Sequence, residues 1–477
     1  MKHVHFLGIC GTAMGAVASA MARQGYVVTG TDANVYPPMS TFLEEEGIRI
    51  FQGYKPENIP AEAELIVIGN AMSRGNAEVE AVLERHLNYK SMPETMKEFF
   101  LRGHRNYVVT GTHGKTTTTS ILTWLMEDAG VNPSFMIGGI ARNLGRGGRF
   151  TDSEFCVLEG DEYDTAFFDK RSKFLHYLPE AVIINNIEMD HADIYANVEE
   201  IKLSFKRLLR VVPRNGIVFI NADCPNCADV RAHAAEELRM VKLVTVGTGE
   251  NADIRIGDLD PKPEGTTFTL TGAADTPYAF NGEHFTVPMV GEFNVRNAAM
   301  ALCAARFSGL SVEQIGASLL RFQGVARRQE VRGCVNGVTV VDDFAHHPTA
   351  IRKAIAGLRQ RFPKSRLWVL FEPRSNTTIR NLFQNELAEA LADADFPVIS
   401  KVENHKKVKT EEQLDEEKLC ADIAATGKEC FVGQNADDIV AHVVSRAHFG
   451  DVLLVMSNGG FGGIHNKLLA ALAALSQ

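Results

Sequence analysis

The chain has 477 residues, which predicts three domains at about 150 residues per domain. Its 45% hydrophobic and 23% charged residues are ordinary for a soluble globular protein. The net charge of −10 and the lack of a long Lys/Arg run argue against nucleic acid as the main partner, and no long apolar run predicts a membrane span.

The N-terminal region predicts a strand–turn–helix–strand unit. Residues 2–7 are typical of a strand, residues 16–23 of a helix, and residues 26–31 of a second strand that ends at Asp32. Such a βαβ unit binds nucleotides at its turn. Residues 6–22 also resemble a signal peptide. Because their glycines are spaced for a phosphate turn, we expect no secretion.

The glycine turn has G-x-x-G-x-x-x-G spacing rather than G-x-G-x-x-G. This spacing disfavours a dinucleotide and favours another pyrophosphate, such as a nucleotide sugar. Asp32 stands where an acidic side chain commonly binds ribose hydroxyls, and a turn-forming Asp is the alternative. A further strand at residues 64–68 ends in polar residues. The candidate substrate-binding residues here are Gly8, Gly11, Thr12, Met14, Gly15, Asp32, Asn70 and Ser73.

Residues 106–120 predict a phosphate loop between a strand and a helix. The loop and first-turn N–H groups would point at phosphate oxygens, and the helix dipole favours negative charge. Lys115 would reach the β/γ-phosphates of ATP, and the Thr116 hydroxyl would hold Mg²⁺. The usual first glycine is replaced by Val109, so the loop is a shortened form; a glycine-rich turn with a chance lysine is the alternative. The predicted ATP-binding residues of the loop are Gly111, Thr112, His113, Gly114, Lys115, Thr116 and Thr117.

Acidic residues follow the next predicted strand, at residues 155–158, and include Glu159, Asp161, Glu162 and Asp164. Carboxylates repel one another unless a positive charge lies among them, so a hard cation is expected; a solvated acidic loop is the alternative. His191 follows the strand at residues 181–184, at the same sheet edge as Thr116 and Glu159. It is a candidate second Mg²⁺ ligand, with a purely structural histidine as the alternative.

The remaining pattern predicts an α/β fold with three domains. Over residues 250–290 the pattern changes to alternating residues with turns between them. This predicts a small antiparallel sheet added to the mostly parallel sheet of the central domain. Asn336-Gly337 between apolar runs predicts a hairpin over residues 331–341. The predicted domains are a Rossmann-like N-terminal domain at 1–104, a central P-loop ATPase-type domain at 105–329, and a Rossmann-like C-terminal domain at 330–477.

Polar turns follow two predicted strands of the third domain, at residues 367–371 and 452–456. Arg374 could bind a carboxylate with two hydrogen bonds, and a glycine loop can offer N–H groups to an anion. Ordinary strand-end turns are the alternative. The candidate substrate-binding residues here are Arg374, Ser375, Asn376, Ser457, Asn458 and Gly459.

Two nucleotide-type sites and a third domain suggest that ATP activates one substrate for attack by another. A simple NTPase motor would not need the first site, and a dehydrogenase would not need Gly-Lys-Thr. A nicotinamide oxidoreductase that uses the Gly8 turn and a non-catalytic nucleotide sensor are the alternatives from other classes.

The chain resembles the Mur ligases, the ATP-dependent amide ligases that build the peptide stem of peptidoglycan. The resemblance covers the whole chain, and the Gly8 turn and the His-His-Pro segment are most similar to the branch that uses UDP-N-acetylmuramate. Residues 162–173 and 457–465 favour a member that adds the recycled tripeptide L-alanyl-γ-D-glutamyl-meso-diaminopimelate over one that adds L-alanine, which is the alternative. The motifs that carry the resemblance are residues 111–117, 159–162, 186–191, 291–297, 324–328 and 342–348.

The resemblance implies that ATP converts the muramate carboxylate to an acyl phosphate, which the tripeptide amine then attacks. Lys115, one or two Mg²⁺ ions and Arg328 would supply the positive charge that brings two anions together. Thr116 and Glu159 would hold the first Mg²⁺ and His191 the second. The implied catalytic residues are Lys115, Glu159, His191 and Arg328, and the further ATP-binding residues are Asn294, Asn297 and, at the ribose, Asp343. Closure of the third domain over ATP would exclude water.

Two further expectations concern lysine and cysteine residues. Several Mur ligases use a carbamylated lysine near the second metal, but that position is Phe205 here, between Lys202 and Lys206, so we predict no carbamate. Eight cysteines are scattered, and the single C-x-x-C, Cys224 to Cys227, lacks a partner pair at zinc spacing. We therefore expect a cytoplasmic chain with reduced cysteines and no metal or redox role for this pair.

Overall fold

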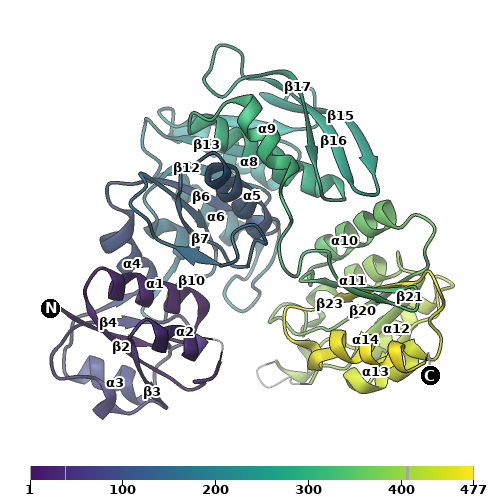
Figure 1. Cartoon of the computed structure of the whole chain (residues 1–477), viewed down its shortest axis with the longest axis horizontal. Coiled ribbons are helices and arrows are strands. Elements are labelled where there is room, and N and C mark those ends of the chain that lie inside the picture. The colour runs from purple at the N-terminus through teal and green to yellow at the C-terminus, as the bar shows by residue number, and fades with distance from the viewer. Residues whose placement is uncertain (1, 38, 404–407, 476–477) are drawn as a thin grey trace.

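The computed structural model describes residues 2–37, 39–403 and 408–475. Three α/β domains follow one another along the chain, and the central domain lies between the two terminal ones (Figure 1). No helix in this described part of the chain has the length and apolar character that crossing a membrane requires. The expected α/β class and the three-domain architecture are confirmed.

The N-terminal domain is built on a parallel sheet of five described strands in the order β3-β2-β1-β4-β5. This is the Rossmann strand order without its sixth strand, and the turn from β1 into α1 lies where the strand order reverses. The short strands β3 and β5 were not predicted, because four and three residues give little periodicity. Its elements are β1 (His3–Leu7), α1 (Thr12–Arg23), β2 (Val27–Asp32), α2 (Met39–Glu45), β3 (Arg49–Gln52), β4 (Ala63–Ile68), α3 (Ala77–Glu84), β5 (Tyr89–Ser91) and α4 (Met92–Met96).

The central domain has one long mixed sheet in the order β17-β16-β15-β14-β13-β12-β6-β9-β7-β8, counted over the described residues. The predicted antiparallel strands β15 to β17 continue this sheet, since β15 pairs in parallel with β14. The strands are β6 (Arg105–Thr110), β7 (Ser134–Met136), β8 (Gly148–Arg149), β9 (Phe155–Glu159), β12 (Pro179–Ile184), β13 (Ile217–Asn221), β14 (Lys242–Gly247), β15 (Ile254–Lys262), β16 (Gly265–Gly272) and β17 (Phe280–Val287). The helices are α5 (Lys115–Asp128), α6 (Val198–Leu209), α7 (Pro225–Glu237), α8 (Glu292–Phe307) and α9 (Val312–Leu320), and a hairpin of β10 (Asp164–Ala166) and β11 (Asp169–Ser172) stands apart.

The C-terminal domain has a sheet in the order β18-β19-β23-β20-β21-β22, parallel except for the first pair. The predicted hairpin is confirmed, because Asn336 and Gly337 adopt positive φ angles of 52° and 75° between β18 and β19. The strands are β18 (Glu330–Val335), β19 (Val338–Asp343), β20 (Leu367–Phe371), β21 (Phe396–Ser400), β22 (Phe431–Gly433) and β23 (Val452–Met456). The helices are α10 (Pro348–Arg361), α11 (Gln384–Leu391), α12 (Glu416–Ala424), α13 (Ala436–Val444) and α14 (Ile464–Ala474).

The hydrophobic cores couple the domains unequally. One core combines N-terminal residues such as Phe6 with central residues such as Val108 and Leu158, so these two domains share buried apolar surface. The two faces of the C-terminal sheet form cores of their own, around Val369 and Trp368. The C-terminal domain therefore meets the central domain without a shared core cluster among the described residues.

The expectation of reduced cysteines is wrong at one position. Cys420, near the end of α12, and Cys430, just before β22, form a disulfide, because the loop between these packed elements brings their Cα atoms to 5.5 Å. Cys224 and Cys227 are free and buried at the start of α7.

Candidate active site

The phosphate loop joins β6 to α5 at the carboxyl edge of the central sheet. Gly111 and Gly114 adopt φ angles of 123° and 82°, which disfavour any residue with a side chain. A Cβ atom on Gly114 would lie 2.3 Å from Asn297 Oδ1, so the loop and α8 are in close contact. The N–H groups of the first turn of α5 have no intrahelical acceptor and are available to an anion.

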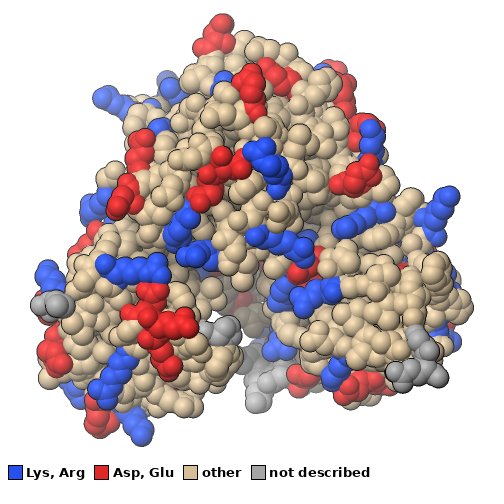
Figure 2. Space-filling view, in the orientation of Figure 1, with Lys and Arg blue, Asp and Glu red and all other residues tan. Residues whose placement is uncertain are grey.

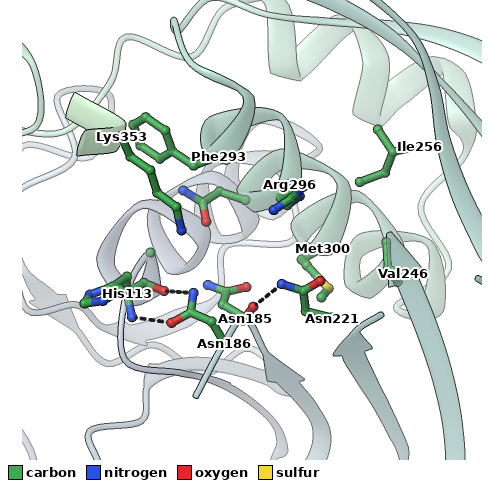
Figure 3. A pocket seen from close by; sticks show the side chains of 12 residues that line it. His113, Asn185, Asn186, Asn221, Val246, Ile256, Phe293, Arg296, Met300 and Lys353 are labelled. Carbon is green, nitrogen blue, oxygen red and sulfur yellow. Dashed lines mark hydrogen bonds between the residues drawn. The ribbon is translucent and has the colours of Figure 1, made fainter. Parts of the chain in front are cut away.

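The phosphate loop is hydrogen bonded to the segment that follows β12. Thr112 N–H donates to the Asn186 carbonyl at 3.0 Å, and His113 N–H donates to Asn186 Oδ1 at 2.8 Å. Asn186 Nδ2 donates back to the His113 carbonyl at 3.0 Å (Figure 3). The Thr112 hydroxyl accepts from Glu188 N–H at 2.9 Å. These bonds fix the backbone that would surround a phosphate group.

Lys115 forms a buried ion pair. Its Nζ lies 2.8 Å and 3.1 Å from the two carboxylate oxygens of Glu162, whose side chain is 1% exposed. Burial alone would lower the pKa of Lys115, but the Glu162 carboxylate raises it above its usual value. Lys115 is therefore a permanently charged ammonium in this site.

The Thr116 hydroxyl connects two charged side chains. It donates to Glu159 Oε1 at 3.0 Å and accepts from Arg328 Nη2 at 3.3 Å. Glu159 Oε2 also accepts from the Gly138 N–H group at 2.6 Å. Burial raises the pKa of Glu159, so a cation beside it would stabilise the ionised carboxylate.

A second group of potential ligands lies next to Lys115. Asp161, Glu162 and His191 each offer one ligand atom, and these atoms lie within 4.8 Å of one another. His191 Nε2 is 3.4 Å from Glu162 Oε1. Burial alone would lower the pKa of His191, but its contact with Glu162 raises it to about 9. His191 also adopts a φ angle of 53°, which orders the loop before the next helix.

One cavity of about 580 Å³ collects the predicted ATP and metal residues. Figure 2 shows the surface hollowed between the three lobes of the molecule. All three domains contribute, since Thr12 of the N-terminal domain and Asp343 of the C-terminal domain both line this cavity. The predicted residues that line it are Thr12, Thr112, His113, Gly114, Lys115, Thr116, Thr117, Glu159, His191, Asn294, Asn297, Arg328 and Asp343.

A smaller cavity of about 40 Å³ lies beside the loop, under α8 and α10. Figure 3 shows Phe293 and Arg296 of α8 and Lys353 of α10 around the space above His113. Burial lowers the pKa of Lys353. Sequence reasoning named none of these three as site residues: Phe293 and Arg296 lie within the 291–297 motif, where only Asn294 and Asn297 were singled out, and Lys353 belongs to no motif.

Asp343 and Arg328 place the C-terminal domain at the cavity. Asp343 accepts from the N–H groups of Gln329 at 2.8 Å and Ala345 at 2.7 Å, which orients its carboxylate at the end of β19. The guanidinium of Arg328 lies 4.6 Å from the centre of the Phe344 ring. Burial raises the pKa of Asp343 and lowers that of Arg328.

The glycine turn of the N-terminal domain has a different structure. Gly8 turns with a φ angle of 83°, and Gly11 caps α1 with extended backbone. Asp32 Oδ2 accepts from the Cys10 N–H group at 2.9 Å, so this carboxylate supports the turn itself. Only Thr12 of the predicted residues of this domain lines the large cavity; Gly8, Gly11, Met14, Gly15, Asp32, Asn70 and Ser73 do not.

The two predicted substrate turns of the C-terminal domain lie against each other. A Cβ atom on Gly459 would lie 2.5 Å from Arg374 Cδ, and Ser457 donates to the carboxylate of Glu372 beside Arg374. Neither turn lines the large cavity. Ser375 bonds within its own turn to Thr378, and Asn458 is half-buried.

These turns are tied to the loop that carries His191. Asn376 Nδ2 donates to Asp193 at 2.9 Å, and the Thr377 hydroxyl donates to Asp190 at 2.9 Å. Arg327 donates to the carbonyls of Ser457 and Gly459 at 2.7 Å each. Thr377, Asp190 and Asp193 carry no signal of a cross-domain contact in the sequence, since their pairing depends on how the domains meet.

The position that holds a carbamylated lysine in several Mur ligases is Phe205 in this chain. Phe205 is fully buried and packs on Phe174 with ring centres 5.5 Å apart. Lys202 is paired with Asp229 and Glu199 on α6. The expectation that no carbamate forms at this position stays a prediction.

Comparison with known proteins then decides the family. Residues 3–104 match the Mur ligase family, catalytic domain, residues 109–305 match the Mur ligase middle domain, and residues 327–459 match the Mur ligase, glutamate ligase domain. A Haemophilus influenzae protein named UDP-N-acetylmuramate–L-alanyl-γ-D-glutamyl-meso-2,6-diaminoheptandioate ligase is 40% identical over 474 residues, which cover 98% of this chain and 99% of that protein. The chain belongs to the Mur ligase family.

Other Mur ligases show how far this similarity extends. The crystal structure of a murein peptide ligase from Psychrobacter arcticus is 35% identical, with a TM-score of 0.72 over 99% of both chains. An Arthrobacter UDP-N-acetylmuramate–L-alanine ligase is 34% identical over 453 residues, which cover 94% of this chain and 91% of that protein. The expected family is therefore confirmed, and relatives that add different groups lie at 40% and 34% identity.

Proposed function

We propose that this Mur ligase joins UDP-N-acetylmuramate to the recycled tripeptide L-alanyl-γ-D-glutamyl-meso-diaminopimelate, with ATP converted to ADP and phosphate. The observation that carries the proposal is the cavity that all three domains line, in which Lys115 and Thr116 face Arg328 and Asp343. The choice of substrates rests on the name of the Haemophilus influenzae relative, which matches nearly the full length of both chains. We place this step of peptidoglycan recycling in the cytoplasm.

The side chains of the cavity fit the activation of a carboxylate by ATP. Carboxylate and γ-phosphate repel each other, and the acyl phosphate forms only where fixed positive charge offsets that repulsion. Lys115 and Arg328 both line the cavity and supply two such charges, Arg328 through its contact with Thr116. Asn294 and Asn297 of α8, buried behind Gly114, are proposed to hold the adenine end, and Asp343 the ribose.

Two Mg²⁺ positions fit the donor atoms that the chain presents. Thr116 and Glu159 offer two oxygens 3.0 Å apart that would hold the first ion, and this ion would supply positive charge to the reacting phosphoryl group. His191 is proposed to hold the second, with Asp161 and Glu162 in place of the missing carbamate. Glu162 is buried and Asp161 half-buried, so a cation between them would offset the desolvation of their charges.

Substrate contacts outside the large cavity are proposals from position. The N–H groups at the start of α1 are proposed to hold the pyrophosphate of UDP-N-acetylmuramate, through the turn residues named from the sequence. The paired turns at Arg374 and at Ser457 to Gly459 are proposed to hold the tripeptide, because Asn376 and Thr377 connect them to the His191 loop. The domain boundaries at 104/105 and 329/330, taken from the sequence pattern, are likewise proposals.

A substrate panel tests the proposal. Phosphate release from ATP is measured with UDP-N-acetylmuramate and, in turn, L-alanine, the dipeptide, the tripeptide and the pentapeptide. We expect release with the tripeptide and not with L-alanine. Release with L-alanine but not with the tripeptide would instead establish a UDP-N-acetylmuramate–L-alanine ligase. This activity is the second candidate because the Arthrobacter relative of that name is 34% identical.

A further inference from the structure

Three side chains from three segments meet beside the phosphate loop, and two of them, His113 and His347, also line the large cavity. His113 belongs to the loop, Glu188 to the segment after β12, and His347 to the turn before α10. Each offers one ligand atom, and these atoms lie within 4.8 Å of one another. Phosphate binding uses the backbone of the loop, so the His113 side chain has no part in the proposed reaction.

The spacing of these atoms fits a small tetrahedral ion. His113 Nε2 lies 3.5 Å and His347 Nδ1 lies 3.7 Å from the same oxygen, Glu188 Oε2. Bond lengths of about 2.0 to 2.2 Å put neighbouring ligands of tetrahedral Zn²⁺ about 3.4 Å apart. Both measured distances to Glu188 Oε2 are within a few tenths of an ångström of that spacing.

The His113 ring presents an unused nitrogen to the cluster. Its Nε2 atom is buried and forms no hydrogen bond with any residue that the structure describes. Its ring centre lies 4.6 Å from that of His347. Its contact with Glu188 Oε2 at 3.5 Å is too long for a strong hydrogen bond, and a metal ion between the two atoms would satisfy both.

His347 is oriented from its other nitrogen. Its Nε2–H group donates to the Met189 carbonyl at 3.1 Å, which leaves the Nδ1 lone pair facing Glu188. This arrangement is the one in which a metal-binding histidine is fixed by an outer hydrogen bond. The Thr349 N–H group donates weakly to Nδ1, at 3.3 Å, and metal coordination would replace that bond.

The charge states also suit a metal. Burial, together with the nearby His113, lowers the pKa of His347 to about 3, so the ring is neutral. Burial alone would raise the pKa of Glu188, but His113 lowers it to about 2, so the carboxylate is ionised. The imidazoles of His113 and His347 together with the Glu188 carboxylate form a donor set that favours Zn²⁺ over Mg²⁺.

We propose that His113, Glu188 and His347 form a binding site for Zn²⁺ or a similar borderline-soft divalent ion, separate from the magnesium sites of the reaction. His113 and Glu188 come from the central domain and His347 from the C-terminal domain. The ion would therefore tie α10 to the phosphate loop across two domains that share no hydrophobic core cluster in the described residues. Domain opening becomes harder when the ion is bound.

The test uses full-length protein stripped with a chelator, free of ATP and Mg²⁺, and titrated with Zn²⁺ against a chromophoric competitor. We expect one tight site per chain and a higher melting temperature with Zn²⁺ bound. Glu188→Gln and His347→Asn should each weaken this binding at least about tenfold, a conservative figure because even outer-shell changes cost 10- to 100-fold. His346→Asn is the matched control, since His346 is the neighbouring imidazole outside the cluster, and it should retain the affinity.

The Cys224–Cys227 pair is the rival soft site and needs its own control. The double variant Cys224→Ser/Cys227→Ser should bind Zn²⁺ as the natural chain does, and the Co²⁺ form should lack sulfur-to-metal charge-transfer absorption. Thiolate absorption or lost binding in this variant would assign the metal to the cysteines. Absence of a tight site in the natural chain, or tight binding kept by both Glu188→Gln and His347→Asn, would overturn the proposal. X-ray absorption spectra of the natural chain show whether sulfur or nitrogen and oxygen atoms bind the metal, and so exclude or assign the cysteines even where a variant fails to fold.

Discussion

A strand–glycine turn–helix unit opens each of the first two domains, one at Gly8 to Gly15 and one at Gly111 to Lys115. Both lie at the carboxyl edge of a sheet and direct the N-terminus of a helix outward. Around the first turn, Asp32 is hydrogen bonded to the Cys10 N–H group. Around the second, Lys115 is held by Glu162, and the loop backbone is bonded on both sides to Asn186.

This difference separates binding from chemistry. A turn that offers only N–H groups can hold a pyrophosphate whose bonds do not change. A turn that must stabilise charge as a phosphoryl group transfers needs fixed cations and metal ligands as well. The ion pair of Lys115 with Glu162 and the contact of Thr116 with Glu159 provide these in the second turn.

The largest expected effect is at Lys115. Lys115→Ala should lower kcat for phosphate release about 1,000-fold, because it removes one charge from the transition state of phosphoryl transfer. Lys418→Ala, on the surface of α12, is the matched control and should leave activity unchanged. Activity within a few-fold of the natural enzyme would show that the second turn, like the first, only binds.

The helix-capping glycines of the two turns give a direct comparison. Gly114→Ala places a Cβ atom at a φ angle of 82° and 2.3 Å from Asn297 Oδ1, so the loop and α8 must shift. We expect at least a tenfold loss of kcat/KM for ATP, consistent with a strain of about 1–2 kcal/mol together with displaced ligands.

Gly11→Ala should be mild by comparison. Gly11 has a φ angle of −66°, and an added Cβ atom would meet its nearest neighbour at 3.7 Å, which is ordinary contact. Stability should change by less than about 1 kcal/mol, and any kinetic effect should fall on KM for UDP-N-acetylmuramate. Equal losses of ATP affinity in both variants would contradict the separation of roles.

Glu162→Gln tests whether the acid serves the metal or only Lys115. As a metal ligand, its loss should raise the Mg²⁺ concentration for half-maximal activity by about 10- to 100-fold. If Glu162 only pairs with Lys115, its loss should change KM for ATP and leave the Mg²⁺ dependence unchanged. Asp164→Asn, which removes the partner of Lys170 in the same acidic run, is the control.

Much of this comparison was predictable from the sequence, and the rest was not, for physical reasons. The turns, the long strands and the order of the domains follow from glycine spacing and apolar runs, which are local properties. The pairing of Lys115 with Glu162 spans 47 residues, and that of Thr377 with Asp190 spans 187, so neither leaves a local pattern. His113, Glu188 and His347 are brought together only by the packing of two domains.

The smallest predicted effect concerns Cys10, a reporter inside the first turn. Burial and the nearby Asp32 carboxylate raise the pKa of Cys10 to about 11, so the reactive thiolate is scarce at pH 8. Alkylation of Cys10, followed by peptide mass spectrometry in a Cys334→Ser background, should be slow at pH 8 and accelerate toward pH 11. Asp32→Asn removes only the electrostatic part and should speed the reaction several-fold at pH 8.

UDP-N-acetylmuramate should protect Cys10 from alkylation and ATP alone should not, since the first turn is proposed to hold the nucleotide sugar and the second turn ATP. Protection by ATP alone would refute that division.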